Sequence, residues 1–350
     1  MTNSALPDGG ATALPALVRD APAVRAPLRA AAEAARAFAE HARAPNTLRA
    51  YRSDWADFTA WCAARGLSAL PASAEAVTLY VAERASGAGE RALKVSTLER
   101  RLAAISQAHR ACGYESPAST KTEPLHSVWA GLVRVKGRAR AKVAPALTPD
   151  VVAMVEALPV LELPGGGRAL TAAARRDRAL LLVGFAGALR RSEIAALQVE
   201  HLAFSADGLR VVIPRSKSDQ EGAGATLGLH YGERPLTCPV RAAREWLRAH
   251  AITEGPVFRS IDRHGNVGAQ PLDGGSVARI VKRAARRAGL DDALYAGHSL
   301  RAGFATQAAR AGKHERAIMR HTRHKSERVL REYIRDGQLF DENPSLGLGL

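Results

Sequence analysis

Apolar residues in the first third of the chain recur at helical spacing. Over residues 47–66 they follow three- and four-residue steps, the repeat of one face of an α-helix. The positions on this face are Leu48, Tyr51, Trp55, Phe58 and Cys62. The segment 95–113 shows the same repeat, and 30–44 is rich in Ala. These patterns predict a first domain of four or five helices over residues 28–133.

From residue 148 the pattern stays helical but includes one stretch that alternates. Thr-Pro-Asp at 148–150 predicts a helix start, with the threonine as N-cap and the proline in the first turn. An apolar helix over 177–198 is interrupted at Gly187. Residues 208–220 alternate and 225–231 form a return segment, which predicts a β-hairpin. Further helices are expected over residues 239–251, 276–289, 298–312, 314–324 and 326–337.

Composition divides the chain further. Residues 1–27 are rich in Ala, Pro and Gly and lack apolar periodicity, so we expect a disordered tail. Residues 134–148 carry five basic and no acidic side chains, which predicts a basic linker. The second domain is then expected over 149–340, with a short tail over 341–350. The predicted fold class is mainly α, with a small antiparallel β-sheet in the second domain.

Charge narrows the class of function. The 350 residues include 50 Lys and Arg against 34 Asp and Glu, a formal net charge of +16. Such an excess indicates a polyanionic partner, nucleic acid first and an anionic membrane surface second. The longest uncharged apolar stretch, 179–189, is far shorter than the roughly 20 residues that span a bilayer, so no membrane segment is expected. Aromatic residues make up 5%, so we expect helical cores of Leu, Ala and Val.

Residues that bind metals or form disulfides show no convincing spacing. The three cysteines are Cys62, Cys112 and Cys238. Their separation excludes a disulfide scaffold and a cysteine zinc module, and the expected location is the reducing cytoplasm, at the nucleoid. His314, His321 and His324 are joined by no acidic residue or cysteine at ligand spacing, so no metal is expected.

Polar residues at four places do not suit their surroundings: after an apolar helix, on one helical face, at a hairpin tip and before an amphipathic helix. These residues are Arg190, His298 with Arg301, Lys217, and His324 with Tyr333 nine residues later. Each one alone is most simply a surface or packing residue. Their order and spacing together are more specific.

In this order and spacing, the chain resembles the tyrosine recombinase (phage integrase) family. The matching segments are GALRRSEI, SKSDQ, HSLR and RHKSERVLREY, and the resemblance extends through most of residues 45–340. The helices over 47–62 and 96–110 look like the family's core-binding domain. The resemblance implies a helical core-binding domain and a mostly helical catalytic domain that clamp double-stranded DNA.

The resemblance also implies a chemistry. Tyr333 would attack a DNA phosphodiester, leaving a 3′-phosphotyrosyl link and a free 5′-hydroxyl. Arg190 and Arg301 would hold the non-bridging oxygens, and Lys217 would protonate the leaving 5′-oxygen. Two guanidiniums suit this task because the transition state concentrates negative charge and arginine stays protonated. Covalent capture conserves the bond energy, so no ATP, metal or other cofactor is expected.

Three more positions are implied to assist. His298 would accept a proton and contact the phosphate, His324 would hydrogen-bond the phosphate, and Glu193 would support the site. Two positions depart from the family's pattern. Arg323 stands where the family usually has Gly before its second histidine, and Ala188 where Gly commonly precedes Leu-Arg. We expect Arg323 either to strain a tight turn or to add a phosphate contact.

Basic residues outside this set are candidates for DNA contact. Four lie off the apolar stripes of the first domain, and three lie on a helix that resembles the family's major-groove helix. They are Arg49, Arg52, Arg100, Arg101, Arg279, Lys282 and Arg283. Both base reading and phosphate contact fit them, and ordinary solvated helix faces are the simpler explanation in the first domain.

The sequence therefore predicts a site-specific DNA recombinase. By the family's pattern, two protomers would bind inverted half-sites, and two such dimers would form a tetramer that exchanges strands through a Holliday junction. Two alternatives stay open. One is a type IB topoisomerase, which shares the chemistry, and the other is a catalytically silent DNA-binding accessory protein.

Overall fold

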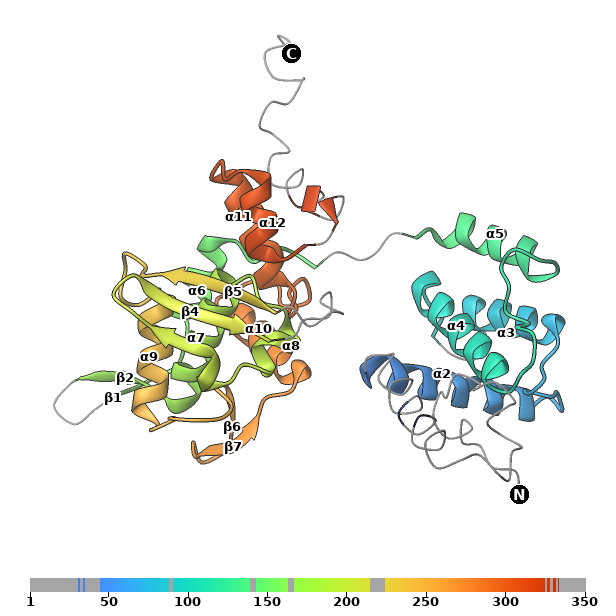
Figure 1. Cartoon of the computed structure of the whole chain (residues 1–350), viewed down its shortest axis with the longest axis horizontal. Helices are drawn as coiled ribbons and strands as arrows, with labels where there is room; N and C mark the ends of the chain where they lie inside the picture. Colours follow the sequence, from blue (N-terminus) through green and yellow to red (C-terminus); the bar gives the residue numbers. More distant parts are fainter. Residues whose placement is uncertain are drawn as a thin grey trace, which may run out of the picture. The chain divides into compact units, whose positions relative to one another are not determined.

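The chain forms two compact units, Met1–Arg140 and Ala141–Leu350 (Figure 1). The computed structural model describes residues 31, 34, 45–87, 91–138, 143–162, 167–214, 224–324, 326–327, 330–331 and 333. Both units are mostly helical and the second carries small antiparallel sheets, which confirms the predicted fold class. The predicted tails 1–27 and 341–350, and nearly all of the helix expected over 30–44, lie outside the described residues.

The first unit is built around an aromatic core. Its described helices are α2 (Pro45–Ala63), α3 (Ala74–Ser86), α4 (Val95–Ala111) and α5 (Leu125–Lys136). The Phe58 ring meets Tyr80 edge-on with centroids 5.0 Å apart, and Trp61 lies 5.3 Å from the same ring. The expectation of Leu, Ala and Val cores is wrong for this unit, because three of the four tryptophans lie in it and bury their large rings there.

The second unit packs helices and short strands around one core. Its helices are α6 (Thr148–Glu156), α7 (Ala172–Ala186), α8 (Arg191–Ala195), η2 (Val199–His201), α9 (Pro239–Ala249), α10 (Gly274–Arg287), α11 (Ser299–Arg310) and α12 (Glu315–Thr322). Its strands are β1 (Val160–Glu162), β2 (Arg168–Leu170), β3 (Leu202–Phe204), β4 (Gly208–Ile213), β5 (Ala225–His230), β6 (Arg259–Ile261) and β7 (Val267–Pro271). Within the described ranges, no helix has the length and apolar character to cross a bilayer.

The predicted hairpin is confirmed as β4 and β5, but the sheet is larger. Its antiparallel order is β3–β4–β5, and two separate ribbons pair β1 with β2 and β6 with β7. Alternate residues of β4 are buried in the core of the unit, namely Leu209, Val211 and Ile213. The strands that sequence reasoning missed have three to five residues, too few for a two-residue repeat to stand out.

The predicted break at Gly187 is confirmed and sets the direction of the next residues. α7 is buried along most of its length, and a side chain at Gly184 would collide with Ile194 of α8. After α7 the chain turns through Ala188, which has a φ of 45°. The turn delivers Arg190 to the start of α8.

The predicted start of α6 is wrong by one residue. Thr148 is the first helical residue, and the cap is supplied by Asp150, whose carboxylate accepts a hydrogen bond of 2.8 Å from the Leu147 N–H. An ionised carboxylate satisfies this amide and also suits the positive end of the helix dipole.

The predicted linker 134–148 is too long at both ends. α5 continues through Lys136, since basic residues stabilise the last turn of a helix. At the other end, the Ala146 N–H donates to the Ser299 carbonyl at 2.9 Å, and Ala146 is fully buried. A Cβ at Gly303 would lie 1.7 Å from the Ala146 oxygen, so the segment around Ala146 packs directly against the backbone of α11. Residues 144–146 therefore belong to the second unit.

Candidate active site

The polar residues that the sequence singled out in the second unit meet beside the turn between α7 and α8. Arg190 precedes α8, His298 and Arg301 begin α11, and His324 follows α12. Tyr333 belongs to a helical stretch that also includes Glu327 and Leu330. The residues brought together are Arg190, Glu193, His298, Arg301, His324 and Tyr333. Lys217 lies outside the described residues.

The Tyr333 hydroxyl lies 2.9 Å from Nε2 of His298. The Tyr333 ring centroid is 6.3 Å from that of His298 and 6.0 Å from that of His324, so the ring contacts both histidines. A small apolar cluster holds this segment: buried Leu330 packs against Ala305 of α11 and neighbouring residues. The phenol is thereby placed next to a group able to accept its proton.

Arg301 is the most deeply buried cation of the site, with 1% of its surface exposed. Its Nη1 donates to the Ala188 carbonyl at 2.7 Å, while its buried Nη2 has no hydrogen-bond partner among the described residues. Burial, followed by the charges of Arg190 and Arg323, lowers the pKa of Arg301 to about 9. A buried guanidinium with an unused donor is suited to binding an anion.

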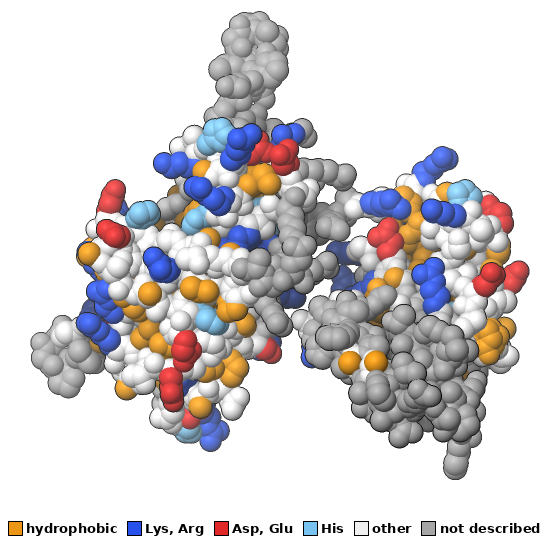
Figure 2. Space-filling model, in the orientation of Figure 1, with side chains coloured by type: hydrophobic (Ala, Val, Ile, Leu, Met, Phe, Trp, Pro, Cys, Tyr) orange, Lys and Arg blue, Asp and Glu red, His pale blue; other side chains and the backbone are white. Residues whose placement is uncertain are grey.

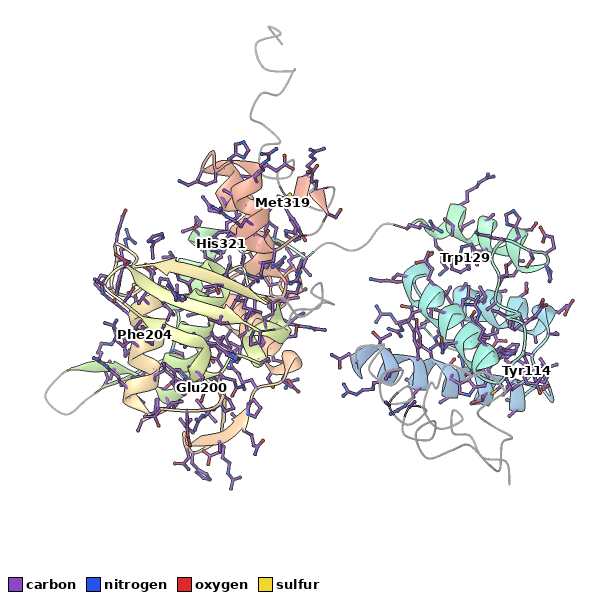
Figure 3. All side chains as sticks on the ribbon, viewed as in Figure 1. Tyr114, Trp129, Glu200, Phe204, Met319 and His321 are labelled. Atoms are coloured by element: carbon purple, nitrogen blue, oxygen red, sulfur yellow. The ribbon has the colours of Figure 1, made fainter. Side chains whose placement is uncertain are left out.

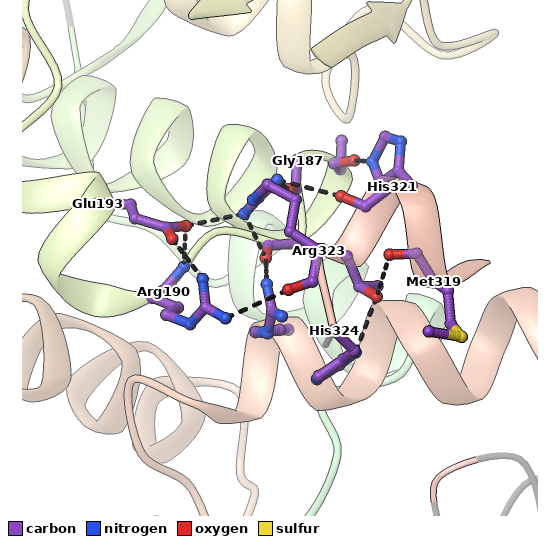
Figure 4. A network of polar contacts seen from close by, with 11 residues as sticks. Gly187, Arg190, Glu193, Met319, His321, Arg323 and His324 are labelled. Carbon is purple, nitrogen blue, oxygen red and sulfur yellow. Dashed lines mark hydrogen bonds and ion pairs between the residues drawn. The ribbon is translucent and has the colours of Figure 1, made fainter. Parts of the chain in front are cut away.

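Glu193 organises the arginines around it (Figure 4). Its carboxylate accepts from the Arg190 backbone N–H at 2.8 Å and from Arg190 Nη1 at 2.7 Å. Its Oε2 also accepts from Nη2 of Arg323 at 2.8 Å. Two guanidiniums, those of Arg190 and Arg323, therefore share one carboxylate, and its charge also acts on the nearby Arg301. The cluster keeps a positive excess that a phosphate would neutralise.

Both histidines beside Tyr333 are held neutral. Burial, then the charges of Arg301 and Arg190, lowers the pKa of His324 to about 3. Burial and then the same two arginines also lower the pKa of His298. A neutral imidazole retains one lone pair, so Nε2 of His298 can accept the Tyr333 proton.

Thr322 assigns the tautomer of His324. Its hydroxyl donates to the Ile318 carbonyl at 2.7 Å and lies 2.8 Å from Nδ1 of His324. Because the hydroxyl has a single proton, we assign the second contact as a bond from Nδ1–H to the threonine oxygen. The lone pair of neutral His324 is then on Nε2. Sequence reasoning missed Thr322, which stands outside every recognised motif.

Two further residues of the site carry a clearer sequence signal. Arg191 directly follows Arg190, and its charge helps to lower the pKa of His298. His321 lies on α12, as Figure 3 shows, and hydrogen-bonds through Nε2 to the Ala186 carbonyl at 2.7 Å. Its ring stacks on Phe304, with centroids 4.6 Å apart. His321 therefore joins α12 to the end of α7.

The DNA-contact candidates of the first unit differ in what their side chains already bind. Arg49, Arg52 and Arg100 are exposed, but Arg100 also makes two hydrogen bonds, of 2.7 and 3.0 Å, to the buried Asp54 carboxylate. Arg101 is bound to Asp57 and to the Tyr80 hydroxyl, with 14% of its side chain exposed. Arg101 is thus a member of the interior network, contrary to its expected place on a solvated face.

The three candidates on α10 also divide. Arg279 is exposed and donates to Ser276, while Lys282 is half-buried. Arg283 donates to the buried Asp177 carboxylate at 2.8 Å, which ties it to α7. Figure 2 shows Lys and Arg side chains on the visible face of each unit.

Known protein families and relatives match both units of the chain. Residues 167–338 match the phage integrase family, and residues 36–112 match the phage integrase N-terminal SAM-like domain. An integrase/recombinase XerD homolog of Selenomonas ruminantium is 38% identical over 307 residues, which is 87% of this chain and 85% of that protein. Tyrosine recombinase XerD of Bifidobacterium longum is 28% identical over 281 residues, 80% of this chain and 83% of that protein.

Solved structures share the fold at low sequence identity. The XerH site-specific recombinase bound to difH in a pre-cleavage complex aligns with a TM-score of 0.58 and 13% identity, covering 89% of this chain and 84% of that one. A lambda integrase dimer bound to a core site aligns with a TM-score of 0.53 and 14% identity, covering 91% and 83%. From the sequence relatives and the matched domains together, the chain belongs to the tyrosine recombinase (phage integrase) family.

Proposed function

We propose that this protein is a site-specific DNA recombinase that cuts and rejoins strands through a phosphotyrosyl link on Tyr333. The observation that carries the proposal is the 2.9 Å contact of Tyr333 with His298, next to buried arginines whose positive charge is only partly compensated by Glu193. Two relatives that align with this chain over more than four fifths of their own length are named as recombinases. The proposed substrate is double-stranded DNA with inverted half-sites.

The arginines supply the binding step. A DNA phosphodiester carries one negative charge, which compensates part of the positive excess at Arg190 and Arg301. Arg301 offers its unused Nη2, and Arg190 lies across the Glu193 carboxylate from Arg323. Charge on the phosphate grows in the transition state, so these groups stabilise that state more than the bound substrate.

The chemical step exchanges one phosphate ester for another. The Tyr333 oxygen bonds to phosphorus while the bond from phosphorus to the 5′-oxygen breaks, and the phenol proton passes to Nε2 of His298. Lys217 is the proposed donor of the proton that the 5′-oxygen takes up. The reverse attack by a 5′-hydroxyl restores the strand and the free tyrosine. No bond energy is lost, so the cycle needs no ATP.

The division into units suggests how the DNA is held. The first unit is the proposed core-binding domain and the second the proposed catalytic domain, so that helices of both contact the duplex. Exposed Arg49, Arg52 and Arg279 are proposed phosphate or base contacts. Assembly of two dimers into a tetramer that passes through a Holliday junction is proposed from the pattern of the family alone.

Covalent trapping tests the function. Nicked duplex fragments from the DNA flanking the protein's own coding region are incubated with the protein, and denaturing electrophoresis detects a protein–DNA adduct. The wild type is expected to form an adduct, and Tyr333→Phe to form none while its DNA mobility shift is retained. Tyr231→Phe is the matched control, because this tyrosine lies in the same unit with its hydroxyl on the Ser205 carbonyl.

Three outcomes would contradict the proposal. An adduct with Tyr333→Phe would assign the nucleophile elsewhere. Relaxation of any supercoiled plasmid, without preference for the trapped sequence, would indicate a type IB topoisomerase. DNA binding without an adduct on any fragment would indicate an accessory protein.

A further inference from the structure

Arg323 occupies a position where the backbone favours glycine. It ends α12 in the left-handed region, with φ 57° and ψ 41°. A side chain in this region crowds its own backbone, so a residue other than glycine needs a compensating interaction. The Arg323 side chain is only 10% exposed, which places the compensation inside the protein.

The guanidinium of Arg323 is used by protein groups on two sides. Its Nη2 donates to Glu193 at 2.8 Å and to the Ala188 carbonyl at 3.3 Å. Its Nη1 donates to the His321 carbonyl at 3.0 Å and to the Gly187 carbonyl at 3.4 Å. Figure 4 shows these contacts joining the end of α12 to the turn between α7 and α8.

The connection runs in both directions. Nη2 of Arg190 donates to the Arg323 carbonyl at 3.4 Å. The residue that follows Arg323 is His324, and the chain then leads to the helical stretch of Tyr333. The Arg323 side chain thus links the turn that carries Arg190 to the segment that carries His324 and Tyr333.

These contacts distinguish two roles for Arg323: a ligand of the phosphate, and a structural link between segments of the protein. Both terminal nitrogens of Arg323 already donate to protein oxygens, and among the described residues only its buried Nε lacks a partner. Arg301 differs, because its buried Nη2 has no partner among the described residues. The unpartnered terminal nitrogen is therefore on Arg301, whereas both terminal nitrogens of Arg323 bind the protein and hold the site in shape.

We propose that Arg323 is a positioning residue for strand cleavage, which fixes Glu193 and the His324 backbone relative to the turn that carries Arg190. The inference rests on the proposed function for its activity readout. Arg323 acts through its neighbours and makes no contact with DNA. Removing it should slow cleavage without weakening the binding of DNA.

The test compares Arg323→Met with Arg320→Met, an exposed arginine one turn earlier on α12. Single-turnover cleavage of the trapped nicked duplex is expected to slow about 10- to 100-fold in Arg323→Met, a typical effect of losing a supporting hydrogen-bond partner. The dissociation constant for that duplex should stay within about threefold of the wild type. Arg320→Met should cleave at the wild-type rate. Arg323→Lys, which keeps the charge but not the fork of donors, should fall between them.

A second readout needs no DNA and no activity. The groups that face His324 are Arg190, Arg301, His298 and Arg323, and each of them lowers its pKa. Histidine NMR titration should therefore show the pKa of His324 rising in Arg323→Met and unchanged in Arg320→Met. If Arg323→Met unfolds, Arg323→Gly suits the left-handed backbone and is expected to give the same slow cleavage and the same rise.

Two results would overturn the inference. Wild-type cleavage with an unchanged His324 titration would show that Arg323 does not position the groups of the site. A loss of DNA affinity as large as the loss of cleavage would make Arg323 a phosphate ligand. Failure of the proposed function looks different, because the wild type itself would then form no adduct while the His324 titration would still separate the variants.

Discussion

Both units contain clusters of arginines around acidic side chains, but the two clusters are balanced differently. In the first unit, Asp54 and Asp57 provide carboxylates for Arg84, Arg100 and Arg101. In the second, Arg190 and Arg323 share Glu193, while the hydrogen-bond partner of Arg301 among the described residues is the Ala188 backbone carbonyl. The first cluster sets two carboxylates against three arginines, whereas the second sets one carboxylate against three arginines and keeps the larger positive excess.

The difference is visible in how each environment treats a guanidinium. Hydrogen bonding to Asp54 raises the pKa of Arg100, whereas burial and neighbouring arginines lower the pKa of Arg301. A raised value means that the folded unit stabilises the charge. A lowered value means that the fold tolerates the charge at a cost, which an anion would relieve. Balanced charge holds the first unit together, and unbalanced charge marks the site of the second.

The largest expected effect comes from removing the unbalanced charge. Arg301→Met should slow covalent adduct formation by about 100-fold or more, because the transition-state phosphate loses a buried donor. Its free energy of unfolding should fall by less than about 1 kcal/mol, the contribution of one hydrogen bond to a carbonyl. Adduct kinetics and urea unfolding measure the two. Arg310→Met, at the exposed end of the same helix, is the control, and a large loss of stability would contradict the comparison.

Removing a balanced charge should have the opposite signature. Asp54→Asn weakens two charged hydrogen bonds and is expected to lower the free energy of unfolding of the first unit by about 2 kcal/mol. Tryptophan fluorescence during urea unfolding reports on this unit through Trp55, Trp61 and Trp129. Glu99→Gln, an exposed residue of α4, should change the stability little. A neutral effect of Asp54→Asn would show that the network contributes nothing to the fold.

The smallest expected effect is a change in pH dependence. Burial lowers the pKa values of His298, His321 and His324 in the folded state, so the unfolded chain binds more protons below about pH 6.5. Stability should therefore fall as the pH drops from 7 to 5. Because the Arg301 charge lowers the pKa values of these histidines, Arg301→Met should make the fall shallower, by less than about 1.4 kcal/mol per pH unit. An unchanged slope in urea midpoints would disprove the electrostatic coupling.

The elements that sequence reasoning placed correctly have long repeats or strong breaks. The helix over 47–66, the interruption at Gly187 and the hairpin around Val211 each follow from local pattern. The ribbons β1–β2 and β6–β7 were not predicted from the sequence, because their pairing is decided by packing and their strands are short. The ends of the linker were not predicted correctly either, since burial of Ala146 against Gly303 depends on a contact between distant segments.

For the site, the sequence by itself determined which chemical groups are available: a phenol, two histidines and a set of arginines in a characteristic order. Local spacing could not show which arginine has both terminal nitrogens bound to the protein and which leaves one without a described partner. Arg323 and Arg301 have the same side chain, and only the tertiary structure ties the first to Glu193 and leaves Nη2 of the second without a described partner. Charge compensation acts across space, between segments more than 100 residues apart, and the linear order of residues does not encode that distance.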